Sequence, residues 1–149
     1  MTQAYTHRFT EVWELWGADA DVYAIGVHAP ALYRSLGNHQ RAVLIVHVGT
    51  IAAAGTVDVA LLQATDAAGT GAKAIAGKNI TQLTQAGGDS GSSVAIELRT
   101  EELDVDGGFS FVGGALTVAG NTAEVGLFAL LGCSNYVPVP ATAWTEIVD

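Results

Sequence analysis

The sequence predicts an all-β protein: an antiparallel β-sandwich, similar to a jelly roll, with about eight strands and extended N- and C-terminal arms. Apolar and polar residues alternate with a period of two over much of the chain after residue 20, which is typical of half-buried strands. Gly, Asp and Asn mark turns at a spacing of about ten residues. No stretch has the length and spacing of the crossover helices that a parallel sheet needs, so an α/β fold is disfavoured.

The chain is long enough for one domain with its own core. It has 149 residues, of which 50% are hydrophobic and 14% are charged. A domain of this size buries about two thirds of its unfolded surface, so it folds without disulfides. The single cysteine, Cys133, excludes an intrachain disulfide and a zinc site built from several cysteines.

The charge balance disfavours two classes of partner. Six Lys and Arg residues stand against fifteen Asp and Glu residues, for a net charge of -9. Phosphate groups are recognised by clustered Lys and Arg, so we expect neither a nucleic acid nor a membrane as a partner. The first residues show no basic stretch followed by an apolar one, which indicates synthesis in a cytoplasm without a secretory signal.

The chain divides into three parts. Residues 1–20 are expected to form an N-terminal arm or a short helix, residues 21–134 the β-sandwich domain, and residues 135–149 an extended C-terminal tail. Pro138 and Pro140 favour the extended tail, because proline removes a backbone donor and restricts the residue before it.

The helical alternative for the N-terminal arm comes from one apolar stripe. Phe9, Val12, Trp13 and Trp16 have the spacing i, i+3, i+4 and i+7, which places them on one face of a helix. Val12 and Trp13 are adjacent, so the strict alternation of a strand fits this segment less well.

The first expected strands differ in their patterns. Asp21–Val27 alternates and predicts a half-buried strand. Arg41–Val48 is a nearly continuous apolar run, which is typical of a strand buried on both faces. Thr56–Gln63 alternates again, with Val57 and Val59 on one face.

The middle of the chain is richer in turn-forming residues. Thr65–Gly71 is expected to be a loop, because its Asp and Gly residues suit turns. Lys73–Leu83 is a weaker strand region broken at Gly77. Gln85–Ser93 is rich in Gly and Ser and is expected to be an exposed loop.

The last strands show clearer signals. Val94–Arg99 alternates strictly, and the polar segment Glu101–Gly108 then turns the chain. Phe109–Ala119 and Thr122–Leu131 are expected to pair as a hairpin joined at Gly120 and Asn121.

One segment resembles the start of a calcium-binding loop. Asp104–Gly107 places two carboxylates two residues apart, as such loops do. The further oxygen ligands are missing, because Gly108 and Phe109 come next. A structural turn is therefore the preferred interpretation, and we expect no metal site.

Catalytic groups do not gather locally in the sequence. The histidines are not spaced as metal ligands are, and His47 lies in an apolar strand, as a core or sheet-face histidine does. Cys133 ends an apolar strand, which favours a buried and inert thiol. Asp89–Ser92 lacks the strand, turn and helix that surround a nucleophilic serine. We expect no catalytic residue and no cofactor.

Aromatic residues and prolines near the two ends of the chain are the candidate interface. Core packing is the simpler role for each aromatic, but terminal arms rich in such residues also clasp neighbouring subunits. A sugar-binding platform is a further alternative. The candidates are Trp13, Trp16, Tyr136, Pro138 and Trp144.

The middle of the chain resembles a known family. The segments Leu61–Lys73, Ile80–Leu83, Glu101–Val105 and Phe109–Val112 form a series of strand edges and turns. This series is similar to small virion proteins of tailed bacteriophages, several of which are jelly-roll cement or decoration proteins. The resemblance covers residues 40–132 approximately and carries no catalytic motif.

The resemblance implies a non-enzymatic structural protein that binds the outside of a phage capsid and stabilises it. The implied partners are the major capsid protein and further copies of the chain, as a homodimer or homotrimer. The implied location is the capsid surface of the virion, after synthesis in the host cytoplasm. Two alternatives stay open: a structural protein of the tail or neck, and a carbohydrate-binding β-sandwich. An enzyme built from distant carboxylates, or from Cys133 and a histidine, is the least favoured class.

Overall fold

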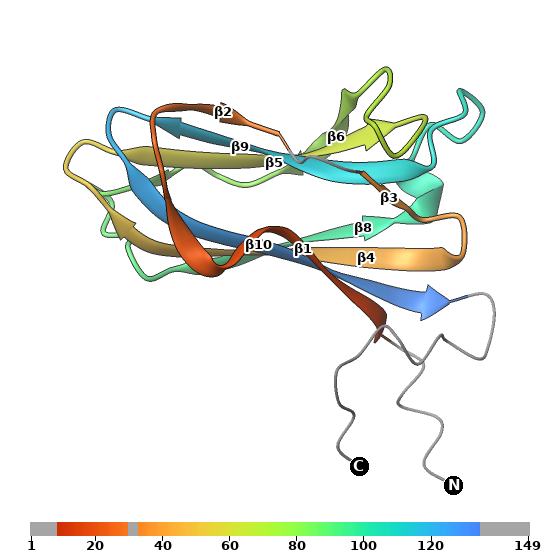
Figure 1. Cartoon of the computed structure of the whole chain (residues 1–149), viewed down its shortest axis with the longest axis horizontal. Helices are drawn as coiled ribbons and strands as arrows, with labels where there is room; N and C mark the ends of the chain where they lie inside the picture. Colours follow the sequence, from red (N-terminus) through yellow and green to blue (C-terminus); the bar gives the residue numbers. More distant parts are fainter. Residues whose placement is uncertain (1–8, 30–32, 135–149) are drawn as a thin grey trace, which may run out of the picture.

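The computed structural model describes residues 9–29 and 33–134, and the side chains of residues 22–29 and 33–127 among them. This part of the chain forms two packed antiparallel sheets (Figure 1). It contains no α-helix, only one short 3-10 turn, η1 (Thr100–Glu102). The predicted all-β sandwich is confirmed. None of its helical turns is long and apolar enough to cross a membrane.

The first sheet has four strands. Their order is β1 (Phe9–Tyr23), β10 (Ala123–Ser134), β4 (His39–Ile51) and β8 (Ser93–Arg99). All three pairings are antiparallel, and the longest continuous register joins β10 to β4. In Figure 1 this sheet is the lower layer.

The second sheet has six strands, and at each of its two edges two short strands pair with the same neighbour. Its order is β2 (Gly26–His28), β9 (Phe111–Ala119), β5 (Thr56–Ala64) and β6 (Lys73–Asn79), while β3 (Arg34–Ser35) also pairs with β9 and β7 (Leu83–Thr84) also pairs with β5. Each sheet therefore has four strand positions. The described residues contain ten strands where the sequence predicts about eight. Asp21–Val27 and Lys73–Leu83 are each divided between two strands, and β3 lies outside every expected strand.

The pairing is nested in the manner of a jelly roll. The first strand pairs with the last, β2 and β3 pair with β9, β4 pairs with β8, and β5 pairs with β6 and β7. Folding one long hairpin over itself gives this order, and it places distant segments side by side. The two ends of β4 thereby lie against the ends of β8 and β10.

The core lies between the inner faces of the two sheets. Alternate residues of each central strand point into it, including Ala42, Leu44, Val46, Val48, Val57, Val59, Leu61, Leu98, Leu116 and Val118. The alternation follows from the pleat, which sends successive side chains to opposite faces. Inward-facing residues of Val94–Arg99 also match the prediction, since Ile96 and Leu98 are buried and Glu97 is exposed.

The prediction that Arg41–Val48 is buried on both faces is wrong. Val43 and Ile45 are only half-buried, and His47 is exposed. An antiparallel sandwich packs one face of each sheet against the core and leaves the other face partly wet. The outer face of β4 is therefore apolar but accessible, and His47 is a sheet-face residue rather than a core one.

The prediction of a helix in residues 1–20 is also wrong for its described part. Residues 9–23 form β1, a full strand of the first sheet, so the sandwich begins before residue 21. The register with β10 shifts between Phe9 and Glu11, between Glu14 and Trp16, and between Trp16 and Asp21. Shifts of this kind interrupt the alternation with period two, so the apolar spacing of an irregular strand need not follow it.

The expected strand Asp21–Val27 proves to be two strands. Its first residues end β1, and its last residues form β2 in the opposite sheet. The chain crosses between the sheets at Ala24 and Ile25, which belong to neither strand. The alternation of burial changes phase there, since Ala24 and Ile25 are both exposed, and the sequence pattern alone does not show this change.

The loop after β5 is closed by one carboxylate. Asp66 Oδ1 accepts hydrogen bonds from the backbone N–H groups of Ala68 and Thr70, both at 3.0 Å, and Oδ2 accepts one from Thr70 Oγ1 at 2.6 Å. The Thr70 hydroxyl, followed by its backbone N–H, holds the pKa of Asp66 below its ordinary value. The predicted loop Thr65–Gly71 is thus an ordered turn.

This carboxylate makes the loop sensitive to acid. A carboxyl with a lowered folded pKa stabilises the fold above the ordinary pKa near 4, and this stabilisation is lost as the pH falls through the folded value. Asp66→Asn is therefore expected to reduce the free energy of unfolding at pH 7 more than at acidic pH. Urea unfolding of both proteins at several pH values measures the difference, and a difference that stays constant down to the acid end contradicts the assignment.

Candidate functional site

The predicted interface residues lie mostly beyond what the structure describes. Trp13 and Trp16 belong to β1, where their backbones pair with Ala129 and Leu127 of β10. Their side chains, and the whole of Tyr136, Pro138 and Trp144, lie outside the described set. Their interface role stays a prediction.

The segment Asp104–Gly107 forms a structural turn. Asp104 Oδ1 accepts a hydrogen bond from the Gly107 N–H at 3.0 Å, and Oδ2 pairs with Lys73 Nζ at 2.6 Å. The lysine lowers the pKa of Asp104 and lies 3.9 Å from the centre of the Phe109 ring. Among the described side chains, no three His, Cys, Asp or Glu residues are placed to hold a metal ion together.

His47 and Ser93 form a contact that the sequence does not reveal. The His47 ring and the Ser93 hydroxyl lie 2.9 Å apart, on adjacent positions of β4 and β8. Both residues are exposed on the outer face of the first sheet. The contact links two strands, and the flat sheet face around it gives a substrate little enclosure.

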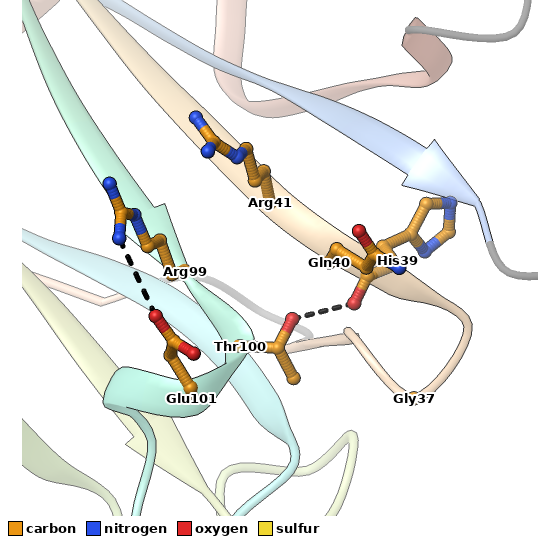
Figure 2. A pocket seen from close by; sticks show the side chains of 7 residues that line it. All are labelled: Gly37, His39, Gln40, Arg41, Arg99, Thr100 and Glu101. Carbon is orange, nitrogen blue, oxygen red and sulfur yellow. Dashed lines mark hydrogen bonds and ion pairs between the residues drawn. The ribbon is translucent and has the colours of Figure 1, made fainter.

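A pocket lies where β4 begins and β8 ends (Figure 2). It is open to solvent, with a volume of about 380 Å³, which falls in the usual range for ligand pockets. Its lining comes from the β3–β4 turn, the first residues of β4 and the β8–η1 junction: Gly37, His39, Gln40, Arg41, Arg99, Thr100 and Glu101.

Two arginines lie side by side at this pocket. Arg41 and Arg99 are register partners on β4 and β8, and both are exposed, whereas their neighbours Ala42 and Leu98 are buried. Residues directly opposite in an antiparallel pair have Cβ atoms about 5 Å apart. The fold therefore places two positive charges side by side on the outer face, in an arrangement that destabilises the strand pair.

Each arginine has one glutamate neighbour. Arg41 Nη1 lies 2.9 Å from Glu97 Oε1, and Arg99 Nη1 lies 3.5 Å from Glu101 Oε1. The two arginine side chains remain 50% and 54% exposed. A guanidinium carries five N–H donors, so each arginine keeps donors for a further acceptor.

The floor of the pocket is held by hydrogen bonds around η1. Thr100 Oγ1 donates to the His39 carbonyl at 2.6 Å, which fixes the turn to the start of β4. Glu102 accepts from the Arg99 N–H at 2.7 Å and pairs with Lys78 Nζ at 2.8 Å. The hydrogen bond from Lys78 lowers the pKa of Glu102, which favours its charged form.

The chemistry of this pocket is that of binding. Guanidinium groups match carboxylates in geometry and bind them through two parallel hydrogen bonds. Thr100 and Gln40 add polar groups at the rim. Sequence reasoning missed the site because positions 41 and 99 meet only through strand pairing. The one available signal is that an arginine opens one expected strand and another closes a later one.

The comparisons with known proteins add no relative. No protein-family model matches the sequence, and no curated protein matches it. The fold, the pocket and the charges of the chain are therefore the observations that bear on its function.

Proposed function

We propose that the protein is a structural component of a tailed-phage virion, a cement or decoration protein that binds the outside of the capsid and stabilises it. The jelly-roll winding of the described residues carries the proposal, because this architecture recurs in viral capsid proteins and agrees with the family that the sequence resembles. The activity is binding, with no chemical step.

The physical properties of the chain suit this role. Its net charge of -9 keeps it soluble and discourages contact with packaged DNA. The proposed partners are the major capsid protein and further copies of the chain. The close-packed core between the two sheets makes the protein rigid, as binding to a capsid lattice requires.

An apolar group near the crossing between the sheets supports a contact with a protein partner. Val22, Ile25 and Val27 are each more than half exposed, and they lie within six positions of the chain. Exposed large apolar side chains that are close together in the chain are candidates for an interaction site. We assign this surface to the capsid.

Rebinding to particles made without the protein tests the proposal. Purified chain should bind such particles to saturation and raise the temperature at which they release DNA. Ile25→Asp should weaken the binding by about tenfold or more, because a contact cannot easily bury an unpaired charge. Val105→Asp is the matched control, since Val105 is also more than half exposed but lies in the Asp104–Gly107 turn.

Two other outcomes would contradict the proposal. Binding restricted to the neck or tail would make the chain a structural protein of that part. No binding to particles, together with binding to a glycan array that is lost on Trp→Ala substitution, would favour the carbohydrate-binding alternative.

A further inference from the structure

We propose that the pocket between β4 and β8 binds the acidic C-terminal segment, Trp144–Asp149, of a second copy of the chain. The inference rests on the proposed function and deepens it, because it names the contact through which copies of the chain join. Charge, strand register and chain length support this contact.

The pocket brings together two of the few positive charges of this chain, each with a glutamate beside it. Only six Lys and Arg residues occur in the whole sequence, and Arg41 and Arg99 are directly opposite each other. Figure 2 shows both side chains rising from neighbouring strands on the same face. Like charges in this position repel each other, so a ligand that brings negative charge stabilises the pair.

The glutamates already present do not block such a ligand. The Arg41–Glu97 and Arg99–Glu101 pairs are about half exposed or more on every side chain, and each is a single contact. Exposed pairs of this kind contribute little to stability. An incoming carboxylate can therefore add to the guanidinium groups, or replace their present partners, at a low energetic cost.

The C-terminal segment has the matching charge. Glu146 and Asp149 are two carboxylates three positions apart, and no Lys or Arg follows Arg99 anywhere in the sequence. The segment also contains apolar residues, Trp144 and Ile147 among them. Two guanidinium groups and two carboxylates give a charge-matched contact with an apolar side.

The strand that precedes this segment, β10, ends beside the pocket. Ser134, the last residue of β10, is the register partner of His39, which lines the pocket. Residues 135–149 therefore follow directly from the pocket edge. An extended chain of this length reaches up to about 50 Å, enough to contact a neighbouring subunit.

A second copy is the favoured source of the segment. Pro138 and Pro140 disfavour compact turns for the residues that precede them and favour an extended course. An extended tail of this length is long enough to reach a neighbouring copy. Two copies related by a two-fold axis can then exchange tails, so that each segment fills the other copy's pocket.

Charge reversal in the full-length chain tests the contact. We expect the purified protein to self-associate, and we expect both R41E/R99E and E146R/D149R to weaken association by about tenfold or more, as for other close charge pairs at interfaces. Mixing the two variants should restore association, because the basic tail of one variant meets the acidic pocket of the other. Light scattering coupled to size-exclusion chromatography measures all three states.

Neutral variants separate the contact from a folding defect. R41Q/R99Q should also weaken association but leave the thermal unfolding midpoint close to that of the unchanged chain, since the arginine pairs are exposed. Asp106→Arg reverses an exposed charge outside the pocket and should leave association unchanged.

Three results would overturn the inference: an unchanged chain that stays monomeric, variants that associate as strongly as it does, or single variants that dissociate but fail to associate when mixed. The last result would assign the segment to the pocket of its own chain. These measurements use no particles, so their failure is distinguishable from a failure of capsid binding.

Discussion

Gly120→Ala is expected to destabilise the fold by about 3–5 kcal/mol, as the sum of backbone strain and a steric clash. Gly120 has a φ of 72°, in the left-handed region that residues with a Cβ atom avoid. An added Cβ would overlap the carbonyl oxygen of Ala54 and lie 3.0 Å from its carbonyl carbon. Both atoms belong to the backbone, so no side-chain rotation relieves the clash.

The clash follows from the packing of two turns. Gly120 connects β9 to β10, and Ala54 lies in the turn between β4 and β5 at the same end of the sandwich. Asn121 joins the same turns, because its side-chain amide donates to the Ala53 carbonyl at 3.1 Å. A change at Gly120 therefore disturbs the connections of both sheets.

Gly88→Ala is the matched control. Gly88 has a φ of 78°, but nothing lies within 4 Å of the Cβ position. This substitution should therefore add backbone strain alone, about 1–2 kcal/mol. Urea unfolding of both variants gives the comparison. Equal losses at the two positions would contradict the close approach of the two turns.

Leu44→Ala is expected to reduce the free energy of unfolding by about 2–5 kcal/mol. Leu44 is 2% exposed at the centre of β4 and belongs to the core between the sheets. The lost methyl groups leave a cavity that the surrounding strands cannot close, because their positions are fixed by pairing on both sides.

Ile45→Ala tests the same strand on its opposite face. Ile45 is half-buried on the outer side of β4, so its truncation should have a smaller effect, about 1 kcal/mol. Chemical unfolding of both variants measures the difference. If the two substitutions were equally costly, or their order were reversed, the assigned inner and outer faces of the sheet would be wrong.

The sequence predicts the sandwich well where its strands are regular. Strict alternation in Val94–Arg99 correctly separates inward from outward residues, and a turn is present at Gly120–Asn121. Both features depend only on local geometry: the pleat sets the alternation, and a positive φ selects glycine. Such signals need no knowledge of distant contacts. The hairpin predicted at the Gly120–Asn121 turn is wrong, because β9 pairs with β5 in the second sheet whereas β10 pairs with β1 and β4 in the first.

The N-terminal segment shows where this reasoning stops. Apolar residues at positions 9, 12, 13 and 16 have the spacing of a helical stripe, yet the segment pairs with β10 as a strand whose register shifts twice between Phe9 and Trp16. An irregularity depends on the partner strand, which lies more than a hundred positions away. The crossing at Ala24 and Ile25 also depends on distant pairing, since β1 pairs with β10 and β2 pairs with β9.

The pocket is a product of topology rather than of a motif. Arg41 and Arg99 look like ordinary polar ends of two strands, and only the antiparallel register of β4 with β8 makes them partners. Conversely, the paired carboxylates at Asp104 and Asp106 attract attention in the sequence, yet Asp104 serves a turn and an ion pair with Lys73. Local spacing therefore suggested one site and missed another.

The stoichiometry of the chain in purified virions tests the central proposal most directly. Quantitative mass spectrometry gives the number of copies per particle relative to the major capsid protein. A capsid cement or decoration protein follows the lattice, so we expect hundreds of copies. About a dozen copies, the number set by a ring at the neck or tail, would contradict a place on the capsid surface. Absence of the chain from the particles would contradict the virion proposal as a whole.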